Sequence, residues 1–119
     1  CAGFPSPAED LGAKRIDLTQ MLITHAQATY FLRASGHSMV EAGIFDNDIL
    51  VVDRAIKPRN NHIVVAIVDG DFTVKQLYQR QGRIKLKAAN PTFPDIVPKD
   101  GQILEIWGVV TSSIKQFPV

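Results

Sequence analysis

The sequence of 119 residues has the length of a single domain, and its 45% hydrophobic and 21% charged residues exclude a disordered chain. Thirteen Lys and Arg residues against twelve Asp and Glu residues give a net charge of +1, so we expect no direct sequence-specific DNA binding. The longest apolar run, residues 63–68, is far too short to cross a membrane. A single cysteine, Cys1, excludes an internal disulfide and a thiolate metal site, and we expect a cytoplasmic protein with neither metal nor cofactor.

The N-terminal residues divide into an arm and the start of a domain. Residues 1–12 contain glycines and prolines that oppose regular structure, so this segment is predicted to be a flexible arm. Residues 13–119 are predicted to form one folded domain. A short helix is predicted over residues 17–24, where Asp17 and Gln20 have the spacing of a capping box.

Short strands dominate the rest of the chain. Alternating or continuous apolar residues bounded by turns predict them, and the pair Asp69-Gly70 predicts a tight hairpin. One helical turn is expected at residues 39–44 and a loop at residues 90–100. Strands are expected over residues 30–35, 49–52, 63–68, 72–78, 83–88 and, as one or two strands, 103–114. This pattern predicts a mostly β fold, a small folded sheet or barrel with one or two short helices.

Lys75 is the first candidate for chemistry. Strand alternation puts it on the face shared by Thr73 and Leu77, and its neighbours along the strand are apolar. A lysine held against such a surface loses hydration, which lowers its pKa and lets the neutral amine act as a base. A lysine whose stem covers the sheet while its amine stays in water is the alternative.

Ser38 is the second candidate. It follows Gly36 where a strand passes into a turn, a place where a hydroxyl is exposed and backbone N–H groups can meet a developing oxyanion. A serine in such a turn is more often only a turn residue, but its combination with a strand lysine is much less common.

The two motifs together resemble one family. The sequence Ser-Gly-His-Ser-Met at residues 35–39, followed by Phe-Thr-Val-Lys at residues 72–75, is similar to the self-cleaving peptidase domain of LexA-type repressors and UmuD-type mutagenesis proteins. Asp46 and Asp48 after the serine, and the Asp69-Gly70 turn before the lysine strand, agree with that pattern. The resemblance covers nearly the whole chain and is closest to the UmuD-like, MucA-type SOS mutagenesis proteins.

The resemblance implies a LexA-type peptidase and dimerisation domain with a defined active site. It implies Ser38 as the nucleophile, Lys75 as its base, and the backbone N–H groups of His37 and Ser38 as oxyanion donors. The family's cleaved bond is Ala-Gly or Cys-Gly, which corresponds to Ala2–Gly3 here. Because the sequence begins at Cys1 rather than Met, we expect the chain to be a fragment, a processed product or a trimmed form.

The family's biology implies partners as well. Cleavage is expected to be promoted by a RecA–single-stranded DNA filament in the DNA-damage response. The shortened product is expected to form a homodimer and to assist the catalytic subunit of an error-prone Y-family DNA polymerase in translesion synthesis. The alternatives are the C-terminal domain of a LexA-type repressor, a non-catalytic assembly subunit after processing, and a type I signal peptidase, which the lack of a membrane anchor disfavours.

The remaining polar candidates are weaker. Neighbouring side chains diverge, so a Ser-His pair of Ser38 and His37 is not expected. His25 and His62 lack metal-ligand spacing and are expected to be solvated loop residues. The Asp46-x-Asp48 motif lacks the glycine and closing glutamate of a calcium loop and is assigned to a turn. The apolar segment around Trp107 fits either the core or a dimer surface.

Overall fold

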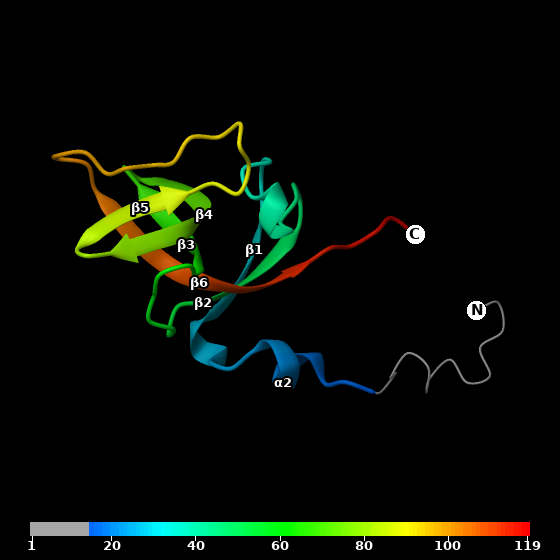
Figure 1. Cartoon of the computed structure of the whole chain (residues 1–119). Helices are drawn as coiled ribbons and strands as arrows, with labels where there is room; N and C mark the ends of the chain where they lie inside the picture. The colour runs from blue at the N-terminus through cyan, green and yellow to red at the C-terminus, as the bar shows by residue number, and fades with distance from the viewer. Residues whose placement is uncertain (1–14) are drawn as a thin grey trace.

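The computed structural model describes residues 15–119. The predicted arm at residues 1–12, with its Ala2–Gly3 bond, lies outside the described residues. The described part is mostly β, as predicted, with one short α-helix and two 3-10 helices (Figure 1). In chain order the elements are α2 (Leu18–Leu22), η1 (Ala26–Ala28), β1 (Thr29–Arg33), η2 (Val40–Ala42), β2 (Ile49–Asp53), β3 (Ile63–Val68), β4 (Asp71–Arg80), β5 (Arg83–Lys87) and β6 (Leu104–Ile114).

One antiparallel sheet of six strands has the order β1-β2-β6-β3-β4-β5. The last strand, β6, is inserted between β2 and β3 and pairs with both (Figure 1). The β3–β4 hairpin predicted from Asp69-Gly70 is confirmed, and both turn residues have positive φ angles, 49° and 88°. Such a turn matches the twist of the flanking strands and favours glycine at its second position.

Both faces of the sheet are buried in places. Val65 belongs to one hydrophobic cluster, with Leu50 and Met39, whereas Val64 and Leu77 belong to a second cluster. Successive side chains of a strand point to opposite faces, so the two clusters lie on the two sides of β3. The sheet therefore curls around its own core rather than resting on a layer of helices.

Two irregularities in the pairing of β6 help the sheet to curl. The pairing with β3 passes from Gly108 to Ile106 and leaves out Trp107, and the pairing with β2 leaves out Thr111. An extra residue in one strand increases the local twist and redirects its side chain. Trp107 thereby becomes available to the pocket described below.

The short helices agree with the predicted ones in place, although not in full length. The Asp17 side chain accepts hydrogen bonds from the backbone N–H groups of Thr19 and Gln20 at 3.1 and 3.3 Å and starts α2, which ends at Leu22. The turn expected at residues 39–44 is the 3-10 helix η2. Helix α2 contains no buried residue, so it stands beside the sheet rather than forming part of the core.

Candidate active site

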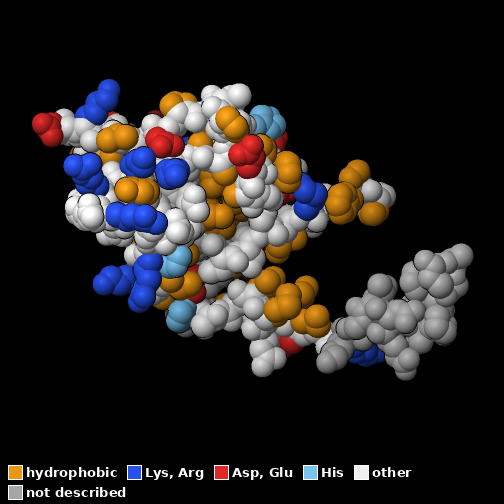
Figure 2. Space-filling model, in the orientation of Figure 1, with side chains coloured by type: hydrophobic (Ala, Val, Ile, Leu, Met, Phe, Trp, Pro, Cys, Tyr) orange, Lys and Arg blue, Asp and Glu red, His pale blue; other side chains and the backbone are white. Residues whose placement is uncertain are grey.

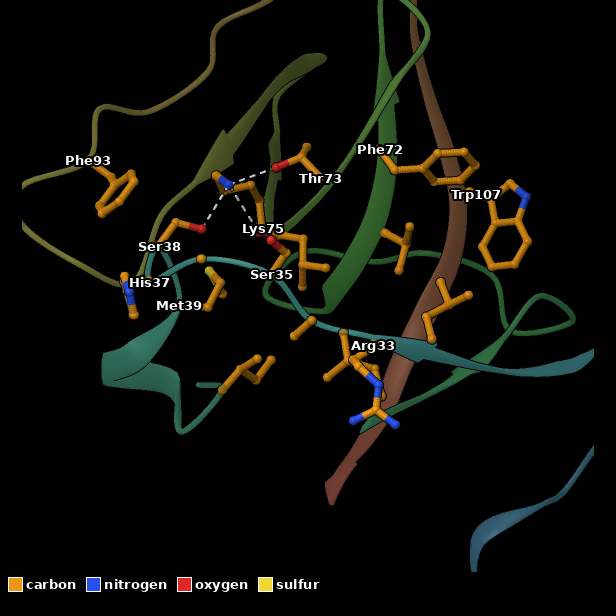
Figure 3. A pocket seen from close by; sticks show the side chains of 17 residues that line it. Arg33, Ser35, His37, Ser38, Met39, Phe72, Thr73, Lys75, Phe93 and Trp107 are labelled. Atoms are coloured by element: carbon orange, nitrogen blue, oxygen red, sulfur yellow. Dashed lines mark hydrogen bonds between the residues drawn. The ribbon is translucent and has the colours of Figure 1, made fainter. Parts of the chain in front are cut away.

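A pocket of about 650 Å³ opens beside the turn that follows β1. Residues 32–39 and the first half of β4, residues 72–75, form much of its wall, with Phe93 and Trp107 at the sides. Hydrophobic side chains reach the surface in the middle of the face shown in Figure 2, and Lys and Arg side chains gather over the β4–β5 side. The pocket thus combines an apolar lining with a small polar group (Figure 3).

That polar group is formed by Ser38, Thr73 and Lys75. The Lys75 Nζ donates hydrogen bonds to Ser38 Oγ at 3.0 Å, to Thr73 Oγ1 at 2.7 Å and to the carbonyl oxygen of Val74 at 3.1 Å. The three side chains converge in Figure 3, and the bonds are drawn there as dashed lines. The structure therefore brings the two residues singled out by the sequence, 37 positions apart, into hydrogen-bond contact.

The environment of Lys75 favours a neutral amine. The residue is 7% exposed, and burial lowers the pKa of its amine below the ordinary value of 10.5. Desolvation acts in this direction because the charged form loses more hydration than the neutral form. Among residues 15–119 no carboxylate forms an ion pair with Lys75 that would oppose this shift.

A glycine shapes the turn that carries Ser38. Gly36 has a φ angle of +90°, which residues with a Cβ rarely adopt. Its backbone N–H donates to Asp46 Oδ1 at 2.8 Å, which ties the turn to the segment between η2 and β2. The serine is thus presented on a constrained loop.

Asp48 connects this loop to the last strand. Its buried carboxylate accepts hydrogen bonds from Lys115 Nζ at 2.8 Å, the Phe45 N–H at 2.9 Å and Ser113 Oγ at 3.2 Å. The bond from Lys115, followed by that from Phe45, holds the pKa of Asp48 below its ordinary value despite burial. The turn role expected for Asp46 and Asp48 is correct, but Asp48 also joins the end of β6.

The segment after β5 holds the other side of the serine turn. The Ala89 N–H donates to the Ser38 carbonyl oxygen at 2.8 Å, and Asn90 Nδ2 donates to the His37 carbonyl oxygen at 2.8 Å. Within the described residues, the N–H groups of His37 and Ser38 donate to no protein acceptor. The His37 ring is exposed and makes no hydrogen bond to Ser38 within this part of the chain.

Aromatic side chains form the far end of the pocket. The centroid of the Trp107 ring lies 5.9 Å from that of Phe72 and 5.2 Å from that of Tyr30. The guanidinium carbon of Arg54 lies 4.5 Å from the centroid of the Trp107 ring. Trp107 is half-buried and is the residue that the β3–β6 pairing leaves out. The sequence left open whether Trp107 lies in the core or on a dimer surface. In the structure it packs at the rim of the pocket, against the hydrophobic cluster that contains Leu50.

The other histidines lie away from the pocket. His25 was expected to be only solvated, but its Nδ1 lies 2.7 Å from Asp53 Oδ2, a buried carboxylate. Burial alone would raise the pKa of Asp53. The hydrogen bonds from His25 and the Ala55 N–H outweigh this effect of burial, so the pKa of Asp53 is lowered overall. His62 Nδ1 accepts from the Arg59 N–H at 3.1 Å. Both therefore have structural partners.

The described residues form neither a metal site nor a membrane-spanning helix. Within residues 15–119 no group of three or more His, Cys, Asp or Glu side chains is placed to hold a metal ion. No helix in that range has the length and apolar content needed to cross a membrane.

A serine and a buried lysine in a mostly β domain are typical of serine–lysine peptidases. The chain matches the Peptidase S24-like family over residues 1–111. The chain therefore belongs to that peptidase family, which confirms the resemblance found in the sequence. It is 47% identical to Protein SamA of Salmonella typhimurium, over 95% of this chain and 78% of that protein. It is 44% identical to Protein MucA of Escherichia coli, over 99% of this chain and 81% of that protein.

A LexA repressor matches over a smaller part. The LexA repressor of Cupriavidus taiwanensis is 43% identical over 72% of this chain, which corresponds to 40% of the repressor. The chain is thus similar to SamA and MucA over most of their length and to the repressor over less than half of its length.

Sequence reasoning missed two residues of the site. Thr73 was placed on the same strand face as Lys75, and that alternation was the signal that could have identified it as a partner of the amine. Asn90 contacts the serine turn from a loop far away in the sequence, and no local pattern indicated it.

Proposed function

We propose that this chain is a serine–lysine endopeptidase that cleaves its own Ala2–Gly3 bond. The hydrogen bond of 3.0 Å between Lys75 Nζ and Ser38 Oγ, in a pocket where the pKa of the lysine is lowered, is the observation that carries the proposal. A neutral amine at this distance can remove the serine proton, as general-base catalysis requires. The small side chains of Ala2 and Gly3 allow the backbone to approach the nucleophile closely.

The first half of the reaction forms an acyl-enzyme. Neutral Lys75 takes the hydroxyl proton of Ser38, and Ser38 Oγ bonds to the carbonyl carbon of Ala2 while the carbonyl π electrons move to its oxygen. This oxyanion is stabilised by backbone N–H groups at His37 and Ser38. When it collapses, the C–N bond breaks, and the amine of Gly3 leaves with the proton that Lys75 held.

The second half regenerates the enzyme. Lys75 takes a proton from water, and the resulting hydroxide adds to the ester carbon. Collapse of this second intermediate breaks the bond to Ser38 Oγ, which recovers its proton from Lys75. The products are a new carboxylate at Ala2 and a chain that begins at Gly3.

The relatives support a proposal for the wider role. The match to SamA and MucA over most of their length favours the SOS mutagenesis branch over a repressor domain, for which the matched share is smaller. In this role the cleaved chain is a cytoplasmic homodimer that assists the catalytic subunit of a Y-family polymerase in translesion synthesis, and a RecA–single-stranded DNA filament promotes the cut. The arm at residues 1–12 is the substrate, and residues 13–119 are the peptidase and dimerisation domain.

The test is the alkaline self-cleavage of the purified chain, followed by intact-mass spectrometry. Wild type should lose Cys1 and Ala2, at a rate that rises with pH as Lys75 is deprotonated. Ser38→Ala and Lys75→Ala should each lower the rate by at least about a thousandfold, because removing either member of a catalytic pair removes most of its effect.

Matched controls distinguish the loss of a catalytic group from a nonspecific effect of removing a serine or a lysine. Ser112→Ala and Lys57→Ala remove the same side-chain types away from the pocket and should cleave like wild type. Loss of Cys1 and Ala2 from Lys75→Ala at the wild-type rate would exclude the mechanism. An unchanged wild-type mass after prolonged alkaline incubation would count against cleavage at this bond.

A further inference from the structure

The serine turn is held by two successive carbonyl groups, and both are bound from the same side. Asn90 Nδ2 donates to the carbonyl oxygen of His37, and the Ala89 N–H donates to that of Ser38, each at 2.8 Å. Neither Ala89 nor Asn90 lines the pocket, whereas His37 and Ser38 do. The two carbonyl groups therefore point away from the pocket.

Peptide geometry then determines where the Ser38 amide points. In a trans peptide the C=O of one residue and the N–H of the next point in opposite directions, and no described peptide bond is cis. Because the His37 carbonyl is directed toward Asn90, the Ser38 N–H is directed toward the pocket. That N–H donates to no protein acceptor among residues 15–119, so it is free to meet a substrate oxygen.

The orientation of the Asn90 amide is set by its other end. Asn90 Oδ1 accepts hydrogen bonds from the Thr92 N–H at 3.1 Å and from Thr92 Oγ1 at 2.9 Å. A flipped amide would place its oxygen against the His37 carbonyl oxygen and its NH₂ against the Thr92 N–H. Only the observed orientation pairs donors with acceptors at both ends.

We propose that Asn90 is a positioning residue for the oxyanion site. It holds the peptide between His37 and Ser38 so that the Ser38 N–H points at the oxygen on which negative charge develops. This inference rests on the proposed function of Ser38 as nucleophile. Asn90 makes no hydrogen bond to the side chain of Ser38 or Lys75, so it acts on the transition state through the backbone and not through the base.

The decisive experiment compares the pH–rate profiles of self-cleavage for wild type and Asn90→Ala. The plateau rate at high pH should fall about 10- to 100-fold. This is a smaller effect than removing an oxyanion donor itself, which lowers the rate about 100- to 1000-fold. The midpoint pH should stay unchanged, because the burial of Lys75 is untouched. A purely structural role would loosen the wall of the pocket, rehydrate Lys75 and move the midpoint up toward 10.5.

Two further variants complete the test. Asn60→Ala is the matched control, since the Asn60 side chain also accepts a backbone N–H, that of Gln79, but lies away from the pocket. It should cleave like wild type. Thr92→Val removes one of the two donors to Asn90 Oδ1 and should lower the plateau by a smaller factor, so it decides the question if Asn90→Ala does not fold.

The possible outcomes separate the two proposals. If Ser38→Ala is inactive but Asn90→Ala keeps the wild-type plateau rate, the role of Asn90 is overturned. If Asn90→Ala does not fold, a wild-type plateau rate in Thr92→Val has the same meaning. A midpoint that rises together with the loss of rate would also overturn it. Cleavage by Ser38→Ala would instead overturn the proposed function on which the inference rests.

Discussion

The amine of Lys75 has three oxygen acceptors around it, and yet burial lowers its pKa. Hydrogen bonds to a charged donor favour the charged form, so each acceptor offsets part of the desolvation. The Thr73 hydroxyl is the nearest of the three, at 2.7 Å, and it sits on the same strand as the lysine. Thr73 is therefore the side chain that most directly positions the Lys75 amine and offsets the lowering of its pKa.

Replacing Thr73 with valine should separate these two effects. Valine has a similar shape but accepts no hydrogen bond, so the ammonium form of Lys75 loses a partner and the midpoint of the pH–rate profile should move to lower pH. The plateau rate should fall by up to about tenfold, because one of the bonds that aims the neutral amine at Ser38 is lost, and a hydrogen bond between neutral groups is worth about 0.5–1.5 kcal/mol. A pH–rate profile of self-cleavage measures both quantities.

Thr73→Ser provides the control, since it keeps the hydroxyl and should keep the wild-type midpoint. A midpoint that moves to higher pH in Thr73→Val would contradict this account of Lys75.

At the level of residues, the sequence predicted the candidate pair Ser38 and Lys75 but not the residues that hold the pair in place. Ser38 and Lys75 were found because the Ser-Gly-His-Ser-Met turn and the lysine strand are local patterns, and the structure places the two side chains within hydrogen-bond distance. Asn90 and Lys115 act through contacts between distant segments, which alternation and turn chemistry do not encode.

Among the elements, β6 has the most constrained surroundings because it lies between β2 and β3. Gly108 is buried there, opposite Val65 and next to Trp107 of the pocket. A Cβ at this position would lie 2.6 Å from Val52 Cγ1 and 3.2 Å from Arg54 Cγ. The glycine is thus required for the close approach of β2 to β6.

Gly108→Ala should destabilise the fold by about 1–3 kcal/mol, which is typical of overpacking in a closely packed core. Val52 is fully buried, so its side chain cannot turn out into solvent to make room. Urea denaturation of wild type and variant measures the difference in the free energy of unfolding. Gly82→Asn offers a contrast: an added Cβ has open space there, and asparagine tolerates the positive φ, so its effect should stay below about 1 kcal/mol.

The strands themselves were largely predictable, and their order was not. Residues 63–68 were expected as a strand and form β3, and the Asp69-Gly70 turn joins it to β4 as expected. Period-two patterns and turn residues are local, so they identify strands and hairpins. The insertion of β6 between β2 and β3 depends on pairings between distant segments, and the bulge at Trp107 follows from those pairings.

For the molecule as a whole, the buried polar groups divide into two kinds. Asp48 and Asp53 are buried but paired, and their pKa values are lowered from about 3.8. They therefore stabilise the fold fully at pH values above the unfolded pKa. This contribution is lost as the pH falls through their lower folded pKa values. Lys75 is buried without a carboxylate partner among the described residues, and its lowered pKa means that folding works against its charged form. Burying Lys75 therefore costs stability, and the proposed role of Lys75 as a base requires that burial.

Lys75→Met should make that cost visible. At pH 7 the wild-type protein must either bury an ammonium or give up a proton that the unfolded chain would keep, because burial lowers the pKa of Lys75. Methionine fills similar space without charge, so the variant should be more stable at pH 7 by about 0.5–2 kcal/mol. Between the lowered folded pKa and about 10.5 the unfolded state binds the extra proton, so wild-type stability rises with pH and the gap should narrow. Urea denaturation at pH 7 and pH 10 measures the gap, with Lys57→Met as the exposed control that should differ little from wild type. A variant less stable than wild type at pH 7, or a gap that widens as pH rises, would show that Lys75 is not strained by its burial and would remove the physical basis for its role as a base.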